Sequence, residues 1–115
     1  MNGADCRITV RDVTVHEGRT VRYEVEYGAR VRRYFSGEDF FATYDRDISR
    51  VPRGILMIPL LASLMPVAWV ADAEVRVDVL DRQFHDSLIH VRAAFASLYP
   101  RLKFAGHLTV GRLTD

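Results

Sequence analysis

Two aspartate–histidine pairs on one predicted helix are the side chains in this sequence best suited to acid–base chemistry. Asp81 and His85 are four residues apart, as are Asp86 and His90, and helical side chains at that spacing lie close enough to touch. A carboxylate that contacts an imidazole can orient the ring as a general base. His85 and His90 lie five residues apart, about 140° around a helix, so they do not bind one metal ion together. Neither pair has a nucleophile placed by a motif, which favours ordinary surface contacts.

Asp45 and Asp47 are a second pair of carboxylates whose spacing suits a ligand. They flank Arg46, and an extended backbone would turn both carboxylates to the same side, where they could hold a cation. The neighbouring residues supply neither the further oxygen ligands nor the glycine of a calcium loop, so a solvated turn is favoured. Residues 36–39 contain one glycine but lack the Lys-Ser/Thr ending of a phosphate-binding loop, which again indicates a turn. The sequence therefore predicts no catalytic residue, no metal ligand and no cofactor in this chain.

A cluster of arginines and tyrosines near one predicted hairpin has the composition of a phosphate-binding or base-binding surface. Its members are Arg22, Arg30, Arg32, Arg33, Tyr23, Tyr27 and Tyr34. Against that interpretation, Glu24, Glu26 and Glu38 neutralise the cluster, and the whole chain carries 16 basic and 15 acidic side chains. A net charge of +1 gives no field that would attract a nucleic acid or an anionic membrane. We therefore expect the tyrosines to face the core, and we expect no nucleic-acid or membrane partner.

Length and composition are those of one folded domain. The chain has 115 residues, enough for one continuous core, and its 49% apolar and 27% charged residues are typical of a globular protein. Cys6 is the single cysteine, so neither an intrachain disulfide nor a cysteine-based metal cluster can form. The first residues lack the basic start and apolar core of a signal peptide. We therefore expect a cytoplasmic protein.

The longest uncharged stretch, residues 54–71, approaches the length of a membrane-spanning helix. Pro59 and Pro66 interrupt it, and Arg53 and Asp72 lie immediately outside its ends, so a buried core helix is the favoured interpretation. The stretch is apolar nearly all round, which is typical either of a helix in the centre of a core or of one covered by a second body. In the second case the candidate interface residues are Ile55, Ile58, Leu61 and Met65.

The first half of the chain has the alternating pattern of β-strands joined by short turns. Strands are predicted over residues 7–15, 21–27, 31–35 and 40–45. A break in the alternation near Arg11 and Asp12 indicates a bulge, and Gly18 suits the positive-φ position of the first turn. Because strands adjacent in sequence usually pair with each other, we expect an antiparallel meander.

The second half of the chain changes to helices and isolated strands. The predicted elements are a helix over residues 52–65, an extension over 67–70, a strand over 74–79 and a last strand over 104–113. Pro59 should bend or restart the first helix. A second helix, capped by Asp81 or Asp78 and ending before Pro100, has its apolar residues at helical spacing. The order is β-β-β-β-α-β-α-β, an α+β domain in which an antiparallel sheet packs against two helices.

Short segments across most of the chain from about Arg30 onward carry a family resemblance. They are Arg33-Tyr34-Phe35, Phe41, Tyr44-Asp45, Val51-Pro52, Ile55-Leu56, Ile58-Pro59-Leu60, Met65-Pro66-Val67-Ala68-Trp69, Val77-Asp78, Phe84, Leu88, Tyr99-Pro100 and Phe104-Ala105-Gly106. Together they resemble the amino-terminal domain that precedes a PP-loop ATP-pyrophosphatase domain, in proteins similar to 7-cyano-7-deazaguanine synthase. In that family a Ser-Gly-Gly-x-Asp-Ser loop cradles the pyrophosphate of ATP, and no segment here matches that loop.

The resemblance implies a non-catalytic accessory domain of an ATP-dependent enzyme, one that positions a substrate or a partner. It implies ATP and Mg²⁺ only for a separate PP-loop catalytic domain, which would be bound in trans or joined in cis by a linker near Thr114-Asp115. The candidate binding residues are Arg32, Arg33, Tyr34, Tyr44, Asp45 and Trp69.

Two alternatives to an accessory domain stay open at this point. One is a freestanding binding module or homodimer whose apolar helix forms the interface. The other is a small enzyme that uses Asp86 with His90, or Asp45 with Asp47, inside a pocket.

Overall fold

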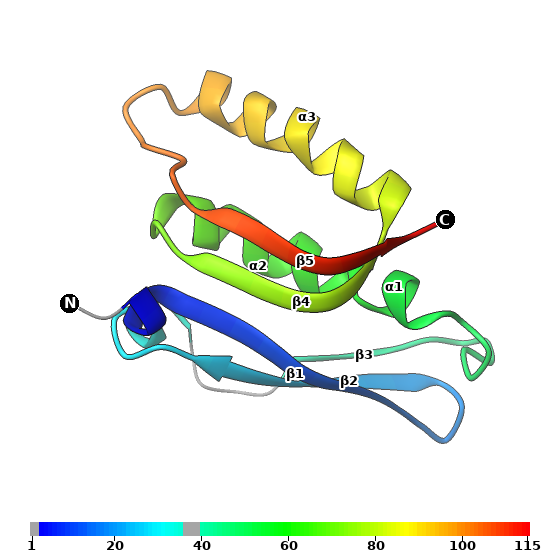
Figure 1. Cartoon of the computed structure of the whole chain (residues 1–115). Helices are drawn as coiled ribbons and strands as arrows, with labels where there is room; N and C mark the ends of the chain where they lie inside the picture. The colour runs from blue at the N-terminus through cyan, green and yellow to red at the C-terminus, as the bar shows by residue number, and fades with distance from the viewer. Residues whose placement is uncertain (1–2, 36–39) are drawn as a thin grey trace.

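The computed structural model describes residues 3–35 and 40–115 as a β-sheet with helices packed on it (Figure 1). Its strands are β1 (Arg7–His16), β2 (Thr20–Tyr27), β3 (Phe41–Thr43), β4 (Glu74–Asp81) and β5 (His107–Thr114). Its helices are α1 (Arg53–Leu56), α2 (Ile58–Val70) and α3 (Arg82–Leu98), with short 3₁₀ helices η1 (Gly3–Cys6) and η2 (Arg32–Tyr34). The α+β class that the sequence predicts is confirmed.

β1 and β2 form the antiparallel hairpin that the alternating pattern predicts. Their register shifts between Val10 and Asp12, which leaves Arg11 as the extra residue of a bulge, as predicted. Gly18 has a φ of 71° in the connecting turn, a conformation that favours glycine. Because the bulge adds one residue, Val13 lies on the same face of the sheet as Val10, and β1 stays apolar toward the core.

The third predicted strand, residues 31–35, is wrong. The carbonyl oxygen of Gly28 accepts hydrogen bonds from the N–H groups of Val31 and Arg32. The chain therefore turns tightly after β2 and forms η2. The buried side chain of Val31 anchors this turn in the core. The fourth predicted strand, residues 40–45, is present but shortened to β3, and the turn predicted over residues 36–39 lies outside the described residues.

The sheet is mixed, so the prediction of an antiparallel sheet is wrong for its second half. The strand order is β3-β2-β1-β4-β5. β2 is antiparallel to β1 and to β3, whereas β4 is parallel to β1 and β5 is parallel to β4. The physical reason is that a helix precedes β4 and another precedes β5, and each helix returns the chain to the same end of the sheet.

The seam between β1 and β4 is short. Its register pairs residues 7–9 of β1 with residues 74–76 of β4, after which the two strands diverge. The side chain of Arg53 in α1 lies across this fork. Its Nη1 is 3.4 Å from Oδ1 of Asp12 on β1, and its Nε is 3.0 Å from Oδ2 of Asp78 on β4. An arginine therefore bridges the two strands where backbone pairing has ended.

The first predicted helix is interrupted and then continues further than expected. α1 ends at Leu56, and α2 restarts at Ile58 with Pro59 in its first turn, where a proline costs no hydrogen bond. α2 then runs past Pro66 to Val70, so the predicted extension over residues 67–70 is helical. Pro66 has no N–H to donate to the carbonyl oxygen of Ala62, and Ala62 lies at an exposed position of the helix.

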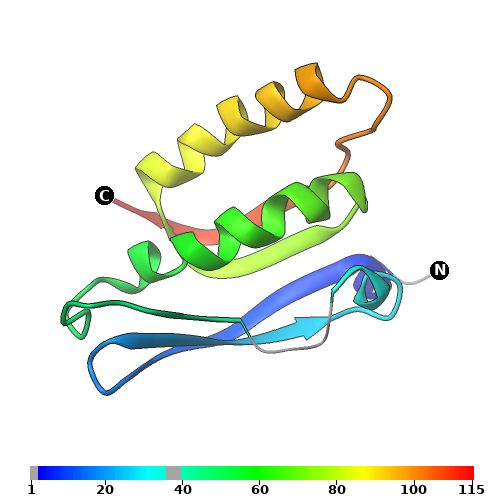
Figure 2. The same ribbon diagram turned by 180° about the vertical axis from the view of Figure 1, so that it is seen from behind.

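α2 covers one face of the sheet, lying behind it in Figure 1 and in front of it in Figure 2. The core between them consists of apolar side chains, and no described polar or charged residue is buried. The largest fully buried side chains are Ile8, Met57, Leu60, Leu61, Met65, Leu80, Val21, Val31 and Val75. Every helix in the described part of the chain is too short or too polar to span a bilayer.

Candidate functional site

An apolar groove opens at the end of the molecule where α2 and α3 finish. Its volume is about 300 Å³. Its lining residues come from η2, α2, α3 and the loop between α3 and β5: Tyr34, Pro66, Val67, Val70, Ala71, Phe95, Tyr99, Leu102 and Phe104. Tyr99 is 52% exposed and Leu102 is 48% exposed, although both side chains are large and apolar. We call this surface the apolar groove.

The loop that follows α3 builds one wall of the apolar groove. The N–H of Tyr99 donates to the carbonyl oxygen of Phe95, and the N–H of Leu102 donates to the carbonyl oxygen of Tyr99, so the chain turns back just beyond the helix. The rings of Phe95 and Tyr99 stack with their centroids 6.5 Å apart. These contacts fix aromatic side chains at the surface in defined positions, which is the arrangement of a preformed binding surface.

Basic side chains border the apolar groove. Arg33 lies over the ring of Tyr34, 4.9 Å from its centroid, and its Nη2 donates to the Tyr34 hydroxyl over 2.8 Å. Tyr34 also lines a smaller pocket of about 100 Å³ that includes Arg33 and Asp72. On the other side, Arg101 and Lys103 are exposed on either side of Leu102 in the sequence. The groove therefore has an apolar centre, with Arg33 next to Tyr34 at its border, Arg101 and Lys103 adjacent to its lining in the sequence, and Asp72 as the acidic neighbour of Ala71.

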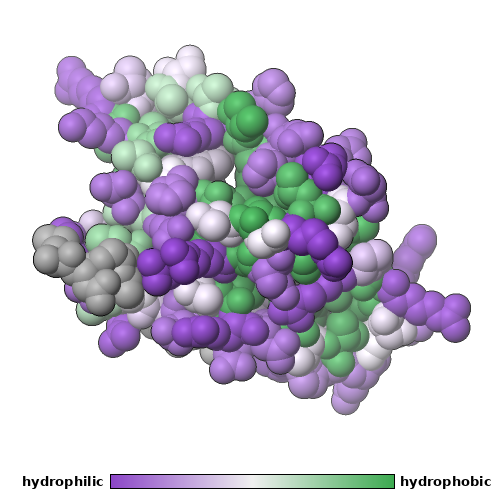
Figure 3. Space-filling model, in the orientation of Figure 1, coloured by the Kyte–Doolittle hydropathy of each residue, from purple (hydrophilic) through white to green (hydrophobic). Residues whose placement is uncertain are grey.

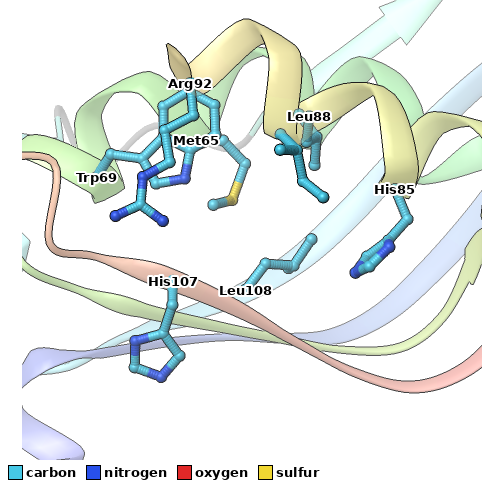
Figure 4. Close-up of a pocket in the computed structure, with 8 residues that line it drawn as sticks. Met65, Trp69, His85, Leu88, Arg92, His107 and Leu108 are labelled. Atoms are coloured by element: carbon cyan, nitrogen blue, oxygen red, sulfur yellow. The ribbon is translucent and has the colours of Figure 1, made fainter. Parts of the chain in front are cut away.

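A second hollow, which we call the α3–β5 cleft, lies between α3 and the edge strand β5. Its volume is about 180 Å³. In Figure 3 hydrophobic side chains are visible in this region between hydrophilic ones. Figure 4 shows the residues that line it, which are Met65, Trp69, His85, Leu88, Ile89, Arg92, His107 and Leu108. Met65, Trp69 and Leu88 are buried, so they form an apolar floor.

Arg92 is the charged side chain that points into the α3–β5 cleft, next to Trp69 (Figure 4). One of its Nη atoms donates a hydrogen bond to the carbonyl oxygen of Phe104, which holds the guanidinium in place. Among the described residues no carboxylate forms a salt bridge with Arg92. The cleft therefore contains an oriented arginine whose charge has no acidic partner in the described part of the chain.

The two histidines of the cleft differ from Arg92 because each contacts an acid. Nδ1 of His85 lies 3.3 Å from a carboxylate oxygen of Asp86. His107 pairs with Glu74 in the β4–β5 register, so its side chain lies on the face of the sheet opposite α2, with Nε2 3.7 Å from the Glu74 carboxylate. Figure 4 accordingly shows His107 pointing away from α3. Neither histidine offers an uncompensated charge to the cleft.

Glu74 is the centre of a hydrogen-bonded cluster on the sheet face opposite α2. Its carboxylate accepts from Nε of Arg7 over 3.0 Å and from the hydroxyl of Thr109 over 2.8 Å, and Nε of Arg76 lies 3.1 Å away. Burial of the carboxylate raises its pKa, but the hydrogen bonds from Thr109, Arg7 and Arg76 outweigh that effect and lower the pKa to about 2. The cluster joins β1, β4 and β5 and has the character of a structural ion-pair network.

The acid–base pairs predicted from spacing do not form a site. Asp81 caps α3 by accepting the N–H of Phe84 over 3.0 Å, so its carboxylate is engaged in the helix end. Asp86 and His90 are exposed on α3, and neither lines a pocket described above. His85 contacts Asp86, its neighbour in the sequence, and not Asp81. The enzyme hypothesis based on Asp86 and His90 thus gains no support from the three pockets described above.

Asp45 and Asp47 lie in an exposed loop after β3, also outside the pockets described above. Asp47 accepts hydrogen bonds from the hydroxyl and the N–H of Ser49, over 2.6 and 2.9 Å, and these bonds lower its pKa. In the described part of the chain no group of three or more potential metal ligands comes together. Asp47 is best explained as the acceptor that closes a turn.

The candidate binding residues are distributed over distant parts of the molecule. Tyr34 lines the apolar groove and Trp69 lines the α3–β5 cleft. The N–H of Tyr44 donates to the carbonyl oxygen of Arg19 at the turn of the β1–β2 hairpin, whereas η2 follows the opposite end of β2. Arg32, Arg33 and Tyr34 therefore lie far from Tyr44 and Asp45, and the set predicted from sequence is not one site.

The candidate interface residues need a correction. Leu61 and Met65 have no exposed surface because both are buried in the core of the same domain, and Ile58 is only partly exposed. Of that set, Ile55 alone is exposed, on α1. Another accessible apolar surface is the apolar groove around Val70, at the end of α2 and in the loop after α3.

Sequence reasoning missed Tyr99 and Leu102 as surface residues. A signal was present, since Leu98 and Tyr99 stand at the helix end immediately before Pro100 and the apolar Leu102 follows it. Apolar residues in a short loop have no helix face to bury them, which makes them candidates for an exposed patch.

Comparisons of the chain with protein-family models, with curated proteins and with solved structures find no match.

Proposed function

We propose that this chain is a non-catalytic accessory domain that packs against a second protein domain through the apolar groove. The observation that carries the proposal is the groove itself, an exposed concave surface of about 300 Å³ lined by apolar and aromatic side chains. Contiguous apolar surfaces of this kind usually mark protein interaction sites.

The charged border of the apolar groove defines the partner. Arg33, Arg101 and Lys103 outnumber Asp72 among the charged residues next to the groove, which favours a partner surface with an apolar centre and carboxylates around it. The family resemblance supports a PP-loop ATP-pyrophosphatase domain as that partner, in cis or in trans. ATP and Mg²⁺ belong to the partner in this proposal, and the present domain positions the partner or its substrate.

The strength of the contact can be bounded from the side chains. Burying a half-exposed valine, leucine or tyrosine contributes roughly 1 kcal/mol, so five such residues contribute roughly 5 kcal/mol. Association costs roughly 4–15 kcal/mol before any affinity appears. The groove therefore needs its charged border to hold a separate partner, whereas a partner tethered in the same chain avoids much of that cost.

A pair of matched variants tests the proposal. Val70 is 43% exposed in the groove and Ile55 is 44% exposed on α1, so aspartate at either position introduces a similar charge at a similar depth. Binding of PP-loop domains encoded by the same genome is measured by calorimetry for the unaltered chain, for Val70→Asp and for Ile55→Asp. We expect Val70→Asp to abolish binding and Ile55→Asp to leave it unchanged. Loss of binding in Ile55→Asp alone would move the interface to α1 and refute the groove.

Sedimentation of the chain at several concentrations separates an accessory domain from a homodimer. A monomer that binds a PP-loop domain supports the proposal. A stable dimer that Val70→Asp dissociates, without affinity for any PP-loop domain, would favour the freestanding module and overturn the accessory role.

A further inference from the structure

The α3–β5 cleft combines an apolar floor with one oriented cation, and this combination points to a ligand of its own. Trp69 and Leu88 contribute indole and hydrocarbon surface above the fully buried Met65, and Leu108 faces them because its register partner Val75 is buried on the same side of the sheet. Arg92 lies at the border of this floor (Figure 4). The cleft does not share its lining residues with the apolar groove, so the inference is independent of the proposed function.

The volume of the cleft limits the size of its ligand. An apolar cavity of roughly 150 Å³ in another protein admits benzene. The α3–β5 cleft, at about 180 Å³, has room for one six-membered ring or a branched alkyl group with a small polar group attached. A nucleotide is too large for this space.

The charge of the cleft sets the polar group of the ligand. The carbonyl oxygen of Phe104 holds the guanidinium of Arg92 from one side, and it leaves donors of the planar fork for an anion. Carboxylates match that fork through charge-assisted hydrogen bonds. His85 and His107 contact Asp86 and Glu74, so Arg92 supplies the uncompensated positive charge among the lining residues.

We propose that the α3–β5 cleft binds a small monocarboxylate with an apolar body of about one ring. The carboxylate pairs with Arg92, and the apolar body lies against Trp69, Leu88 and Leu108. Because the arginine is already fixed by Phe104, little side-chain freedom is lost when the ligand binds.

The single tryptophan of the chain makes a direct test possible. Trp69 lines the cleft, and its indole N–H gives the one tryptophan side-chain peak in a ¹H–¹⁵N correlation spectrum. The probes are phenylacetate and its neutral isostere phenylacetamide, each titrated until the peak stops moving. We expect a saturable shift with phenylacetate and an affinity at least about tenfold lower for the amide, the size of effect that a charge-assisted hydrogen bond produces.

Two arginine variants complete the test. We expect Arg92→Met to weaken phenylacetate binding about tenfold or more, while Arg50→Met, an exposed control in the loop before α1, leaves it unchanged. Arg92→Lys keeps the charge without the planar fork, so its affinity for phenylacetate should lie between that of the unaltered protein and that of Arg92→Met. Thermal unfolding checks that each variant folds. Equal affinities for the acid and the amide, an unchanged affinity in folded Arg92→Met and Arg92→Lys, or no saturable shift in the unaltered protein would each overturn the proposal.

Discussion

The Glu74 cluster gives the most quantitative prediction about this domain. In the folded state the carboxylate of Glu74 has a pKa of about 2, against an ordinary value of 4.5. A group whose pKa is lowered by folding stabilises the folded state above its unfolded pKa, and that stabilisation is lost as the pH falls toward the folded pKa. The contribution of Glu74 should thus be complete at neutral pH and should disappear between about pH 4.5 and pH 2.

The magnitude of this contribution follows from the pKa difference. A fall from 4.5 to about 2 corresponds to an upper limit of roughly 3 kcal/mol. The Glu74 side chain is 19% exposed and those of Arg7 and Arg76 are 30% and 46% exposed, so solvent screens part of the interaction. We expect Glu74→Gln to lower the free energy of unfolding by about 1–2 kcal/mol at pH 7, and by close to zero near pH 2.

Urea denaturation of the unaltered chain and of Glu74→Gln at pH 7, 4, 3 and 2 measures this difference, because effects of other acidic groups cancel between the two proteins. Glu24→Gln is the matched control: Glu24 lies on the same face of the sheet, and no ion pair joins it to another described residue. The free energy of unfolding of Glu24→Gln should differ little from that of the unaltered chain at every pH. A constant difference for Glu74→Gln down to pH 2 would refute the assigned pKa and its cause.

Two further predictions concern the packing of the helices. Leu61→Ala should lower the free energy of unfolding by about 2–5 kcal/mol in urea denaturation, because Leu61 is fully buried, and a change near zero would mean that Leu61 faces solvent after all. Asp81→Ala should lower it by about 1 kcal/mol through loss of the α3 cap, while Asp81→Asn should retain most of the stability; equal losses in both variants would contradict a capping role.

Local patterns predicted the parts of the fold that depend on neighbours in the sequence. The bulge at Arg11, the turn at Gly18, the restart at Pro59 and the cap at Asp81 follow from the chemistry of one residue and its neighbours, and all are present. The strand predicted over residues 31–35 is absent because a short apolar run with two adjacent arginines suits a turn as well as a strand.

Pairings between distant segments could not be predicted in the same way. Nothing in the local pattern of β4 specifies that it lies parallel to β1, since that choice depends on where the helix before it returns the chain. The apolar groove is assembled from η2, α2, α3 and the following loop, and the α3–β5 cleft from three elements. Trp69 and Tyr34 were recognised as candidates, but their separate surroundings exist only in the folded chain.

The short seam between β1 and β4 has a consequence for how the domain folds. On one side of it, β1, β2 and β3 are joined by turns and loops, and on the other side α2, β4, α3 and β5 follow each other directly. Each side can form from contacts close in sequence, whereas the seam closes a loop between Arg7 and Glu74. We therefore expect the two sides to behave as separate cooperative units in native-state hydrogen exchange. At the seam β1 also pairs with β2 and β4 with β5, so only the backbone amides of residues 7–9 and 74–76 that bond across the seam should be protected last during refolding. The ion pairs of Arg53 with Asp12 and Asp78 would then form late, between two units that are already folded.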